Sequence, residues 1–345
     1  ALIGALANDD NSPLGNWRTN SDNNTAITVL EGMNTYSKNK IVYSKGADVN
    51  LNEGGVVKFH EKVKINDNDR SGFNKAIKTA LHSDVVVIVI GEDGFQSGEG
   101  RSRANINIPG VQQELLEEVY KVNKNVVLVL MNGRPLNINW ADKNIPSIIE
   151  AWQLGSQTGN AIAQVIYGDY NPSGKLPMTF PRNVGQIPIY YNYKNTGRPG
   201  PSSSVFWSHY NDEENTPLYP FGYGLSYTSF EYSELKIDTK TLLIGNSINV
   251  SIKLKNSGNY KGKEVVQMYI RDKYASVTRP VRELKGFELV ELMPGETKNI
   301  KFKISEPLLR FYSANEVWES EAGKFDVFIG TNSNAYLKET FELIK

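Results

Sequence analysis

An acidic, glycine-rich loop directly follows an apolar run in VVVIVIGEDGFQSGEGRSR, residues 85–103. The loop carries the carboxylates of Glu92, Asp93 and Glu99 between glycines. Glycine lets a backbone fold back and approach a ligand closely. Carboxylates in such a loop could ligate a divalent cation, exchange a proton with a substrate, or simply pair with arginines.

The residue types narrow these chemistries without deciding between them. The loop lacks the alternating Asp/Asn spacing of a calcium-binding EF-hand, so the pattern does not favour a metal site. It also lacks the G-x-x-x-x-G-K-[ST] and G-x-G-x-x-G phosphate-binding patterns. Two interpretations stay open: a general acid/base, or a solvated loop whose carboxylates pair with Arg101, Arg103 or helix ends.

The first part of the chain alternates apolar strands with amphipathic helices, which predicts a mostly parallel sheet covered on both faces. We expect helices in TAITVLEGMNTYS with Thr25 as N-cap, in GFNKAIKTALHS with Phe73, Ile77 and Leu81 on one face, and in PGVQQELLEEVYKVN with Pro109 in the first turn. The expected strands, in order, are ALIGAL, KIVYSKG, DVVVIVIGE, NVVLVLMNGRP and PSIIEAW.

Ligands bind open parallel sheets at the carboxyl ends of the strands, and the acidic loop lies at such an end. Arg134 in NGRP follows another strand end. We expect a structural ion pair for Arg134. Glu92 directly ends its strand, so we expect it to fix the loop or cap a helix.

From Phe230 onward the apolar pattern has a period of two, in short segments separated by Gly, Asn and Pro turns. This predicts an all-β sandwich, and the absence of Cys favours the fibronectin type III kind over a disulfide-bonded immunoglobulin domain. Residues 190–229 are rich in Pro, Gly and Tyr. We expect them to wrap against the first domain through Phe206, Trp207, Tyr219 and Phe221, or to face a substrate. The predicted domains are therefore 1–189 and 230–345, joined by 190–229.

Composition excludes several classes of function. The chain has 38 Lys+Arg and 38 Asp+Glu, so it shows no electrostatic footprint for nucleic acid. It has no Cys, and His60, His82 and His209 show no metal-ligand spacing. No apolar stretch is long enough to span a bilayer, and we expect no signal peptide within these residues. The sequence starts within an expected strand, from which we expect a longer natural protein.

Longer motifs resemble one family. RSRANINIPGVQQELLEEV, EAWQLGSQTGNAIAQVIYGDYNPSGKLPMTFP and NTPLYPFGYGLSYTSFEYS are similar to the C-terminal part of glycoside hydrolase family 3 enzymes of the periplasmic β-glucosidase type. VVQMYIRD, RPVRELKGFE and PGETKNI resemble the third, fibronectin type III-like domain of that family. The resemblance covers essentially the whole chain.

This resemblance implies an (α/β)6 sandwich followed by the fibronectin-like domain. In the family, a preceding (β/α)8-type barrel carries the nucleophilic Asp, and this sequence contains no match to it. The position of the family's acid/base Glu, just before an arginine and the I-x-I-P of a helix start, corresponds to Glu99. The resemblance further implies that Trp17 and Arg103 bind substrate, although Trp17 could instead be a partly buried core residue.

The implied function is one half of a retaining, exo-acting β-glucosidase that acts on oligosaccharides or glucosides, without a cofactor or a metal. Its expected partner is the barrel, on the same or a separate chain, and we expect the missing barrel to leave an exposed face or a homodimer contact. A β-xylosidase, or a carbohydrate-binding module without catalysis, are the alternatives. A periplasmic or secreted location is implied by the resemblance alone.

Overall fold

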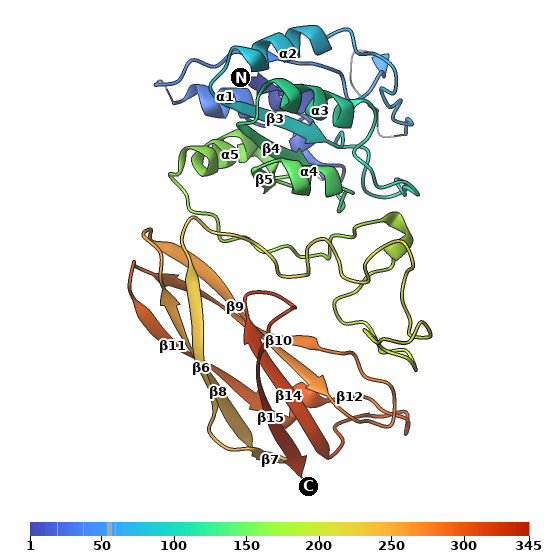
Figure 1. Cartoon of the computed structure of the whole chain (residues 1–345), viewed down its shortest axis with the longest axis vertical. Coiled ribbons are helices and arrows are strands. Elements are labelled where there is room, and N and C mark those ends of the chain that lie inside the picture. Colours follow the sequence, from blue (N-terminus) through green and yellow to red (C-terminus); the bar gives the residue numbers. More distant parts are fainter. Residues whose placement is uncertain (19, 37, 54–56, 59, 345) are drawn as a thin grey trace. The chain divides into compact units, whose positions relative to one another are not determined.

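The computed structural model describes residues 1–345 except 19, 37, 54–56, 59 and 345. The chain forms two compact units (Figure 1). The first comprises residues 1–170 and 182–185, and the second comprises 171–181 and 186–345.

A five-stranded parallel sheet forms the centre of the first unit, with the order β2-β1-β3-β4-β5. The strands are β1 (Leu2–Ile3), β2 (Tyr43–Ser44), β3 (Val86–Gly91), β4 (Val126–Met131) and β5 (Ser147–Glu150). The helices are α1 (Val29–Asn34), α2 (Phe73–Leu81), α3 (Gln112–Val122), α4 (Asn139–Asn144) and α5 (Thr158–Tyr167). The short 3-10 helices are η1 (Ala5–Asn8), η2 (Ser12–Leu14), η4 (Gly155–Gln157) and, at the edge of the second unit, η5 (Val184–Gln186).

Continuous apolar runs make β3 and β4 the buried centre of this sheet, as parallel strands covered on both faces require. Successive side chains point to opposite faces. Val87 and Val129 therefore share a face, and they pack with Val29 of α1 and Ile162 of α5. α2 and α3 contact each other above the opposite face (Figure 1). The predicted parallel α/β architecture is confirmed.

Helix α1 starts later than predicted. Thr28, not Thr25, is its N-cap: the Thr28 hydroxyl accepts a hydrogen bond from the Glu31 amide (3.1 Å), and the Glu31 carboxylate accepts one from the Thr28 amide (2.8 Å). The Thr25 hydroxyl instead donates to the carbonyl of Asp22. A reciprocal capping box satisfies two amides at once, which explains why Thr28 prevails.

Three other local predictions were wrong in detail. Pro109 lies before α3 rather than in its first turn, because the amide of Val111 donates to the Asn66 carbonyl (3.1 Å) and only then does the helix begin. Leu81 is 54% exposed, since α2 buries the small Ala76 and Ala80 alongside Phe73. The predicted ALIGAL strand is only β1, because the chain turns at Gly4 into η1.

The second unit is a β-sandwich, as predicted. One sheet has the order β10-β9-β14-β15-β7, the other β11-β8-β6, and β12 pairs with β13. The strands are β6 (Phe230–Ile237), β7 (Thr241–Leu243), β8 (Ser247–Asn256), β9 (Gly262–Asp272), β10 (Glu283–Leu292), β11 (Thr297–Ser305), β12 (Phe311–Tyr312), β13 (Trp318–Glu319), β14 (Gly323–Gly330) and β15 (Leu337–Ile344), with a 3-10 helix η6 (Glu306–Leu309).

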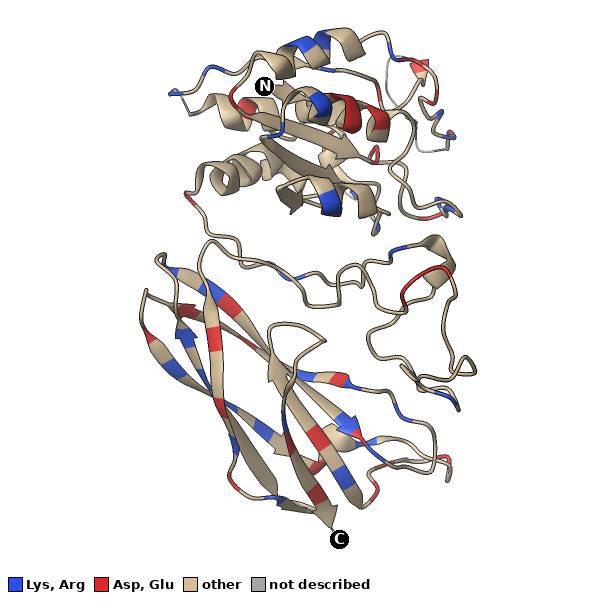
Figure 2. Cartoon of the chain, in the orientation of Figure 1, with Lys and Arg blue, Asp and Glu red and all other residues tan. Residues whose placement is uncertain are grey.

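Alternation along the strands builds the core of this sandwich. In β8 the buried Ile248, Val250 and Ile252 alternate with more exposed residues, and they pack with Val266 and Met268 of β9. Charged residues of both signs are interspersed on the strands (Figure 2).

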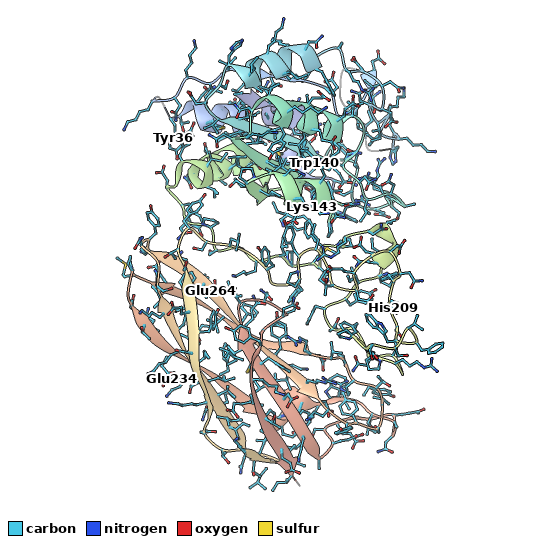
Figure 3. All side chains as sticks on the ribbon, in the orientation of Figure 1. Tyr36, Trp140, Lys143, His209, Glu234 and Glu264 are labelled. Carbon is cyan, nitrogen blue, oxygen red and sulfur yellow. The ribbon has the colours of Figure 1, made fainter. Side chains whose placement is uncertain are left out.

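Residues 171–181 attach to the sandwich through a buried ion pair. Glu264 lies on β9 (labelled in Figure 3), and its carboxylate is 3.0 Å from the Lys175 ammonium. Lys175 also donates to the Gly224 carbonyl (3.0 Å) and the Thr331 hydroxyl (2.8 Å). Tyr232 donates its hydroxyl to the Glu264 carboxylate (2.8 Å). All three ammonium donors of Lys175 thus have partners, as a buried charge requires.

The aromatic segment 190–229 makes its described contacts within the second unit. Phe221 stacks on Tyr191, with ring centroids 4.3 Å apart, and Tyr219 meets Phe180 edge to face. Phe206 is 71% exposed and Trp207 stacks on His209. Phe206 and Trp207 thus contact Arg198 and His209 of the segment itself, whereas Tyr219 packs on Phe180, a residue of the predicted first domain 1–189. The exposure of Phe206 contradicts its predicted burial, and the packing of the whole segment onto the first domain stays a prediction. The boundaries at 189/190 and 229/230 stay predictions.

A close contact between α1 and α5 generates the first testable prediction. A Cβ added to Gly159 would lie 1.9 Å from the backbone oxygen of Thr28. Gly159→Ala should therefore lower the free energy of unfolding by about 1–3 kcal/mol in urea titrations, although alanine is otherwise about 1 kcal/mol the better helix former. Gly174→Ala is the control, because nothing lies within 4 Å of its added Cβ. Equal stability of the two variants would contradict this account of the packing.

Candidate active site at the carboxyl ends of the strands

Polar residues gather where the central strands of the first unit end. Glu92 follows β3, Asn132 follows β4, and Glu150 is the last residue of β5. Neighbouring parallel strands end at the same edge, so these three side chains meet there. The Asn132 amide group lies 3.4 Å from the Glu150 carboxylate, and the amide of its neighbour Gly133 donates to Glu92.

Glu92 is the buried centre of this edge. Its side chain has no exposed surface, and its carboxylate lies 2.7 Å from the Arg103 guanidinium and 3.0 Å from that of Arg134. The amide of Gly133 donates to the same carboxylate at 3.1 Å. The predicted ion pair of Arg134 and the loop-fixing role of Glu92 are therefore what the structure shows. A carboxylate enclosed in this way is not accessible to a substrate.

The first residues of the loop after Glu92 are buried. Asp93 accepts hydrogen bonds from the Asn50 side chain (2.9 Å) and the Phe95 amide (2.8 Å). Burial raises the pKa of Asp93, opposed by these hydrogen bonds and by the charge of Arg18. The Arg18 guanidinium lies over the Phe95 ring, 5.1 Å from its centroid. Asp93 therefore orders the first residues of the loop.

Glu99 stands at the exposed tip of the same loop. Residues 98–100 are exposed, whereas 91–97 are buried. Gly98 and Gly100 have φ of +112° and +68°, conformations that favour glycine and place Glu99 in a tight turn. Among the residues that the structure describes, none donates a hydrogen bond to the Glu99 carboxylate. Of the three loop carboxylates, only Glu99 is free to meet a ligand.

Trp17 lies in a second loop that contacts the acidic loop. The side chain of its neighbour Asn16 lies against Gly98, because a Cβ on that glycine would fall 2.4 Å from the Asn16 amide nitrogen. Trp17 itself is 70% exposed. The structure thus brings Trp17 close to the Glu99 loop and shows that it is no core residue.

The side chain of Arg103 points toward the Glu92 cluster, which consists of Glu92, Arg103, Arg134 and the Gly133 amide. One guanidinium nitrogen pairs with Glu92 and the other donates to the Asn107 carbonyl (2.9 Å). Its side chain is 19% exposed. Its predicted role in substrate binding stays a prediction.

Sequence reasoning missed Glu150 and Asn132. Burial raises the pKa of the Glu150 carboxyl to about 8, and the nearby charge of Glu92 adds to this, against hydrogen bonds from Trp152 and Asn132. The residue keeps some exposed surface, but the protein encloses the carboxyl group itself. A glutamate at the end of an apolar strand, in SIIE, was the available signal. This signal for Glu150 is as strong as the signal for Glu92, which also follows an apolar strand.

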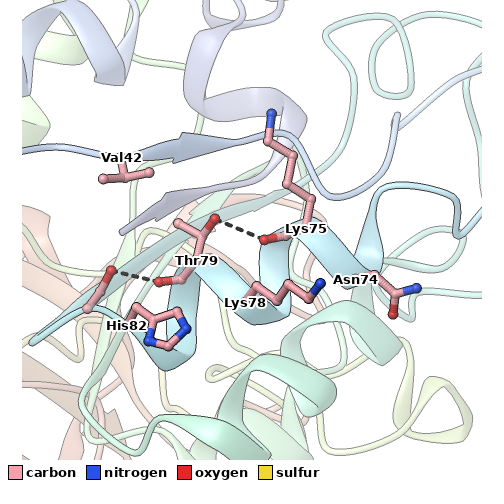
Figure 4. A pocket seen from close by; sticks show the side chains of 7 residues that line it. Val42, Asn74, Lys75, Lys78, Thr79 and His82 are labelled. Carbon is pink, nitrogen blue, oxygen red and sulfur yellow. Dashed lines mark hydrogen bonds between the residues drawn. The ribbon is translucent and has the colours of Figure 1, made fainter.

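Other features of the unit lack this concentration of groups. A shallow depression of about 510 Å³ on α2 is lined by Lys75, Lys78 and His82 (Figure 4), and Val42 on its rim precedes β2, towards the amino ends of the strands. Within the described part of the chain, no three His, Asp or Glu side chains gather in a way that could hold a metal ion. In the same residues no helix is long and apolar enough to cross a membrane.

Comparison with known proteins agrees with this architecture. Residues 1–227 match the model of the glycosyl hydrolase family 3 C-terminal domain. The chain belongs to glycoside hydrolase family 3. Residues 264–333 of this family 3 chain match the fibronectin type III-like domain.

Curated relatives of the family 3 chain are glycosidases. A periplasmic β-glucosidase of Salmonella typhimurium is 43% identical over 353 aligned residues, which span 100% of this chain but 46% of the relative. A β-xylosidase of Formosa agariphila is 40% identical over 90% of this chain and 40% of its own length. The chain thus spans less than half of these relatives.

Solved structures show the same relation. A β-glucosidase from Listeria innocua, in complex with glucose, is 34% identical and superposes with a TM-score of 0.88 over 100% of this chain and 46% of its own. A β-glucosidase from Erythrobacter marinus gives a TM-score of 0.89 at 32% identity. The family 3 chain therefore corresponds to under half of an enzyme of this kind.

The contrast between Glu92 and Glu99 is testable. Glu92→Gln would leave the guanidinium groups of Arg103 and Arg134 without their fully buried carboxylate and should cost about 3–5 kcal/mol of unfolding free energy. Glu99→Gln, the same change seven positions on at an exposed site, should stay within about 0.5 kcal/mol of the unmodified chain. Urea unfolding measures both. A Glu99 effect as large as that of Glu92 would contradict the assignment of the two carboxylates.

Glu150 should make stability depend on pH. Its pKa in the folded chain is raised from 4.5 to about 8, so between these values the folded state holds a proton that the unfolded state has released. The free energy of unfolding should therefore fall as pH rises from 5 to 8, by at most about 1.4 kcal/mol per unit from this group. Urea titrations should show the unmodified chain lose stability relative to Glu150→Gln across this range, because Gln does not titrate. A constant difference would refute the raised pKa.

Proposed function

We propose that this chain is the acid/base-bearing half of a retaining, exo-acting β-glucosidase that removes terminal β-D-glucosyl residues from oligosaccharides or glucosides. The proposal depends on one observation: in a family 3 C-terminal domain, the described loop after β3 exposes one of its three carboxylates, that of Glu99. The other carboxylates of this loop, Glu92 and Asp93, are buried and already bonded.

In the proposed mechanism the nucleophile is an Asp on the barrel that the family resemblance implies. It would attack the anomeric carbon while Glu99 protonates the departing glycosidic oxygen. Glu99 would then take a proton from water as that water displaces the sugar from the Asp. A retaining pair of carboxyl groups stands roughly 5–5.5 Å apart, so the tip of the loop must reach over the sugar held by the barrel.

Trp17 would form one wall of the sugar site. Its exposed indole lies on the loop that contacts Gly98, next to Glu99. Aromatic faces stack well on the apolar faces of sugar rings. Arg103 would contribute through the Glu92 cluster beneath the loop, with substrate contact only if its guanidinium exchanges one of its present partners.

The residues of this chain do not determine which sugar is cleaved. The β-xylosidase of Formosa agariphila, at 40% identity, supports activity on xylosides as a second candidate. The name of the Salmonella typhimurium relative supports a periplasmic location. The partner would be a barrel domain, and self-association is a further outcome that light scattering can measure.

Hydrolysis of aryl β-glucosides and β-xylosides tests the proposal. The chain would be assayed alone and together with the N-terminal part of the Salmonella typhimurium relative, mixed or joined as one polypeptide. We expect no turnover by the chain alone and turnover by the assembly. Glu99→Gln should lower that turnover by roughly 10²–10⁴-fold, the usual contribution of a general acid/base.

Two outcomes would contradict this proposal. Turnover by the chain alone would place a nucleophile within these residues. An inert assembly of folded, associated parts would favour a carbohydrate-binding module without catalysis, and calorimetry with glucose oligomers would then identify its ligand.

A further inference from the structure

The guanidinium of Arg134 contacts the Glu99 loop on both sides of its tip. One nitrogen, Nη2, donates to the carbonyl of Gln96 and also to that of Arg101, the latter at 2.8 Å. Residues 97–100, with Glu99 among them, lie between these two carbonyls. The two contacts therefore hold together the two ends of the segment 97–100.

Glu92 holds Arg134 in place for this contact. The Nε of Arg134 lies 3.0 Å from the Glu92 carboxylate, which also accepts the amide of Gly133, the preceding residue. Side chain and backbone of this short segment are therefore anchored to one buried acid. A planar guanidinium offers donors in a fixed fork, so Nε can pair with the acid while Nη2 reaches the loop.

Neutralising Glu92 does not by itself require Arg134. Arg103 already lies 2.7 Å from the same carboxylate. One buried acid with two arginines has a cation in excess. The second guanidinium is explained by the two loop carbonyls that it binds, which would otherwise lose a donor.

We propose that Arg134 is a positioning residue, which clamps the carbonyls of Gln96 and Arg101 and so sets where the Glu99 carboxylate stands over a bound sugar. The inference rests on the proposed function for the role of Glu99. The clamp itself does not depend on it. Because these two carbonyls flank residues 97–100, fixing them limits the positions that the Glu99 carboxylate can take.

Hydrogen exchange on the chain alone tests the clamp. The amides of Gln96 and Arg101 are bonded within the loop, to the carbonyls of Asp93 and Gly98. Arg134→Lys keeps a cation beside Glu92 but loses the fork, and Arg134→Gln removes the charge while Arg103 still pairs with Glu92. Both should speed exchange in the peptide 93–103 by roughly tenfold, as expected for lost hydrogen bonds. Arg70→Gln, at an exposed pair with Glu114, is the matched control and should leave this peptide unchanged.

Leaving-group dependence in the active assembly tests the positioning role. A dinitrophenyl glucoside departs with little protonation, whereas an alkyl glucoside requires the general acid. Glu99→Gln should therefore lose far more rate on the alkyl substrate. Arg134→Lys should show the same bias, at roughly 10-fold or more on the alkyl glucoside and under about 3-fold on the dinitrophenyl glucoside. A variant that is merely less stable would lose equal fractions on both.

The outcomes separate the two levels of the inference. Unchanged exchange in both Arg134 variants overturns the clamp. Faster exchange with equal losses on the two substrates overturns the positioning role and leaves a structural arginine. If Glu99→Gln itself shows no leaving-group bias, the proposed role of Glu99 fails, and the positioning role fails with it.

Discussion

The buried carboxylate of Glu92 is the interaction on which the carboxyl-end edge of the first unit depends. It has no exposed surface and is surrounded by Arg103, Arg134 and the amide of Gly133. Burying a charge is costly unless partners compensate it, so the segments that supply these partners are held together. They are the end of β3, the turn after β4 and the far side of the acidic loop. The exposed tip with Glu99 is the part of this arrangement that remains free.

The same principle organises the second unit. Glu264 on β9 is buried and is compensated by Lys175 and the Tyr232 hydroxyl. Lys175 comes from a segment that precedes the sandwich by many residues, so the ion pair fixes an otherwise irregular stretch of chain. In both units a buried carboxylate binds segments without regular secondary structure, which the apolar core does not order. The apolar residues of the strands stabilise the remainder of each fold.

Much of this could be predicted, and the failures have local physical causes. Apolar runs such as β3 have one stable environment, the centre of a parallel sheet, so both fold classes were found from pattern alone. The start of α1 was wrong because Thr25 and Thr28 are both suitable caps, and only the reciprocal bond with Glu31 distinguishes them. Leu81 was placed on the wrong face because α2 packs through alanines, which carry little signal in an apolar pattern.

The sequence by itself determined the two architectures, the family and the position of the acidic loop after β3, because these follow from periodicity and from long motifs. Only the tertiary structure decided which loop acid is buried and which is exposed. The loop has three carboxylates of the same chemical type within eight positions, at Glu92, Asp93 and Glu99. Which of them is buried depends on the arginines and amides that distant segments bring to each. The elevated pKa of Glu150 and the two-sided grip of Arg134 on the loop arise in the same way, from neighbours that are far apart along the chain.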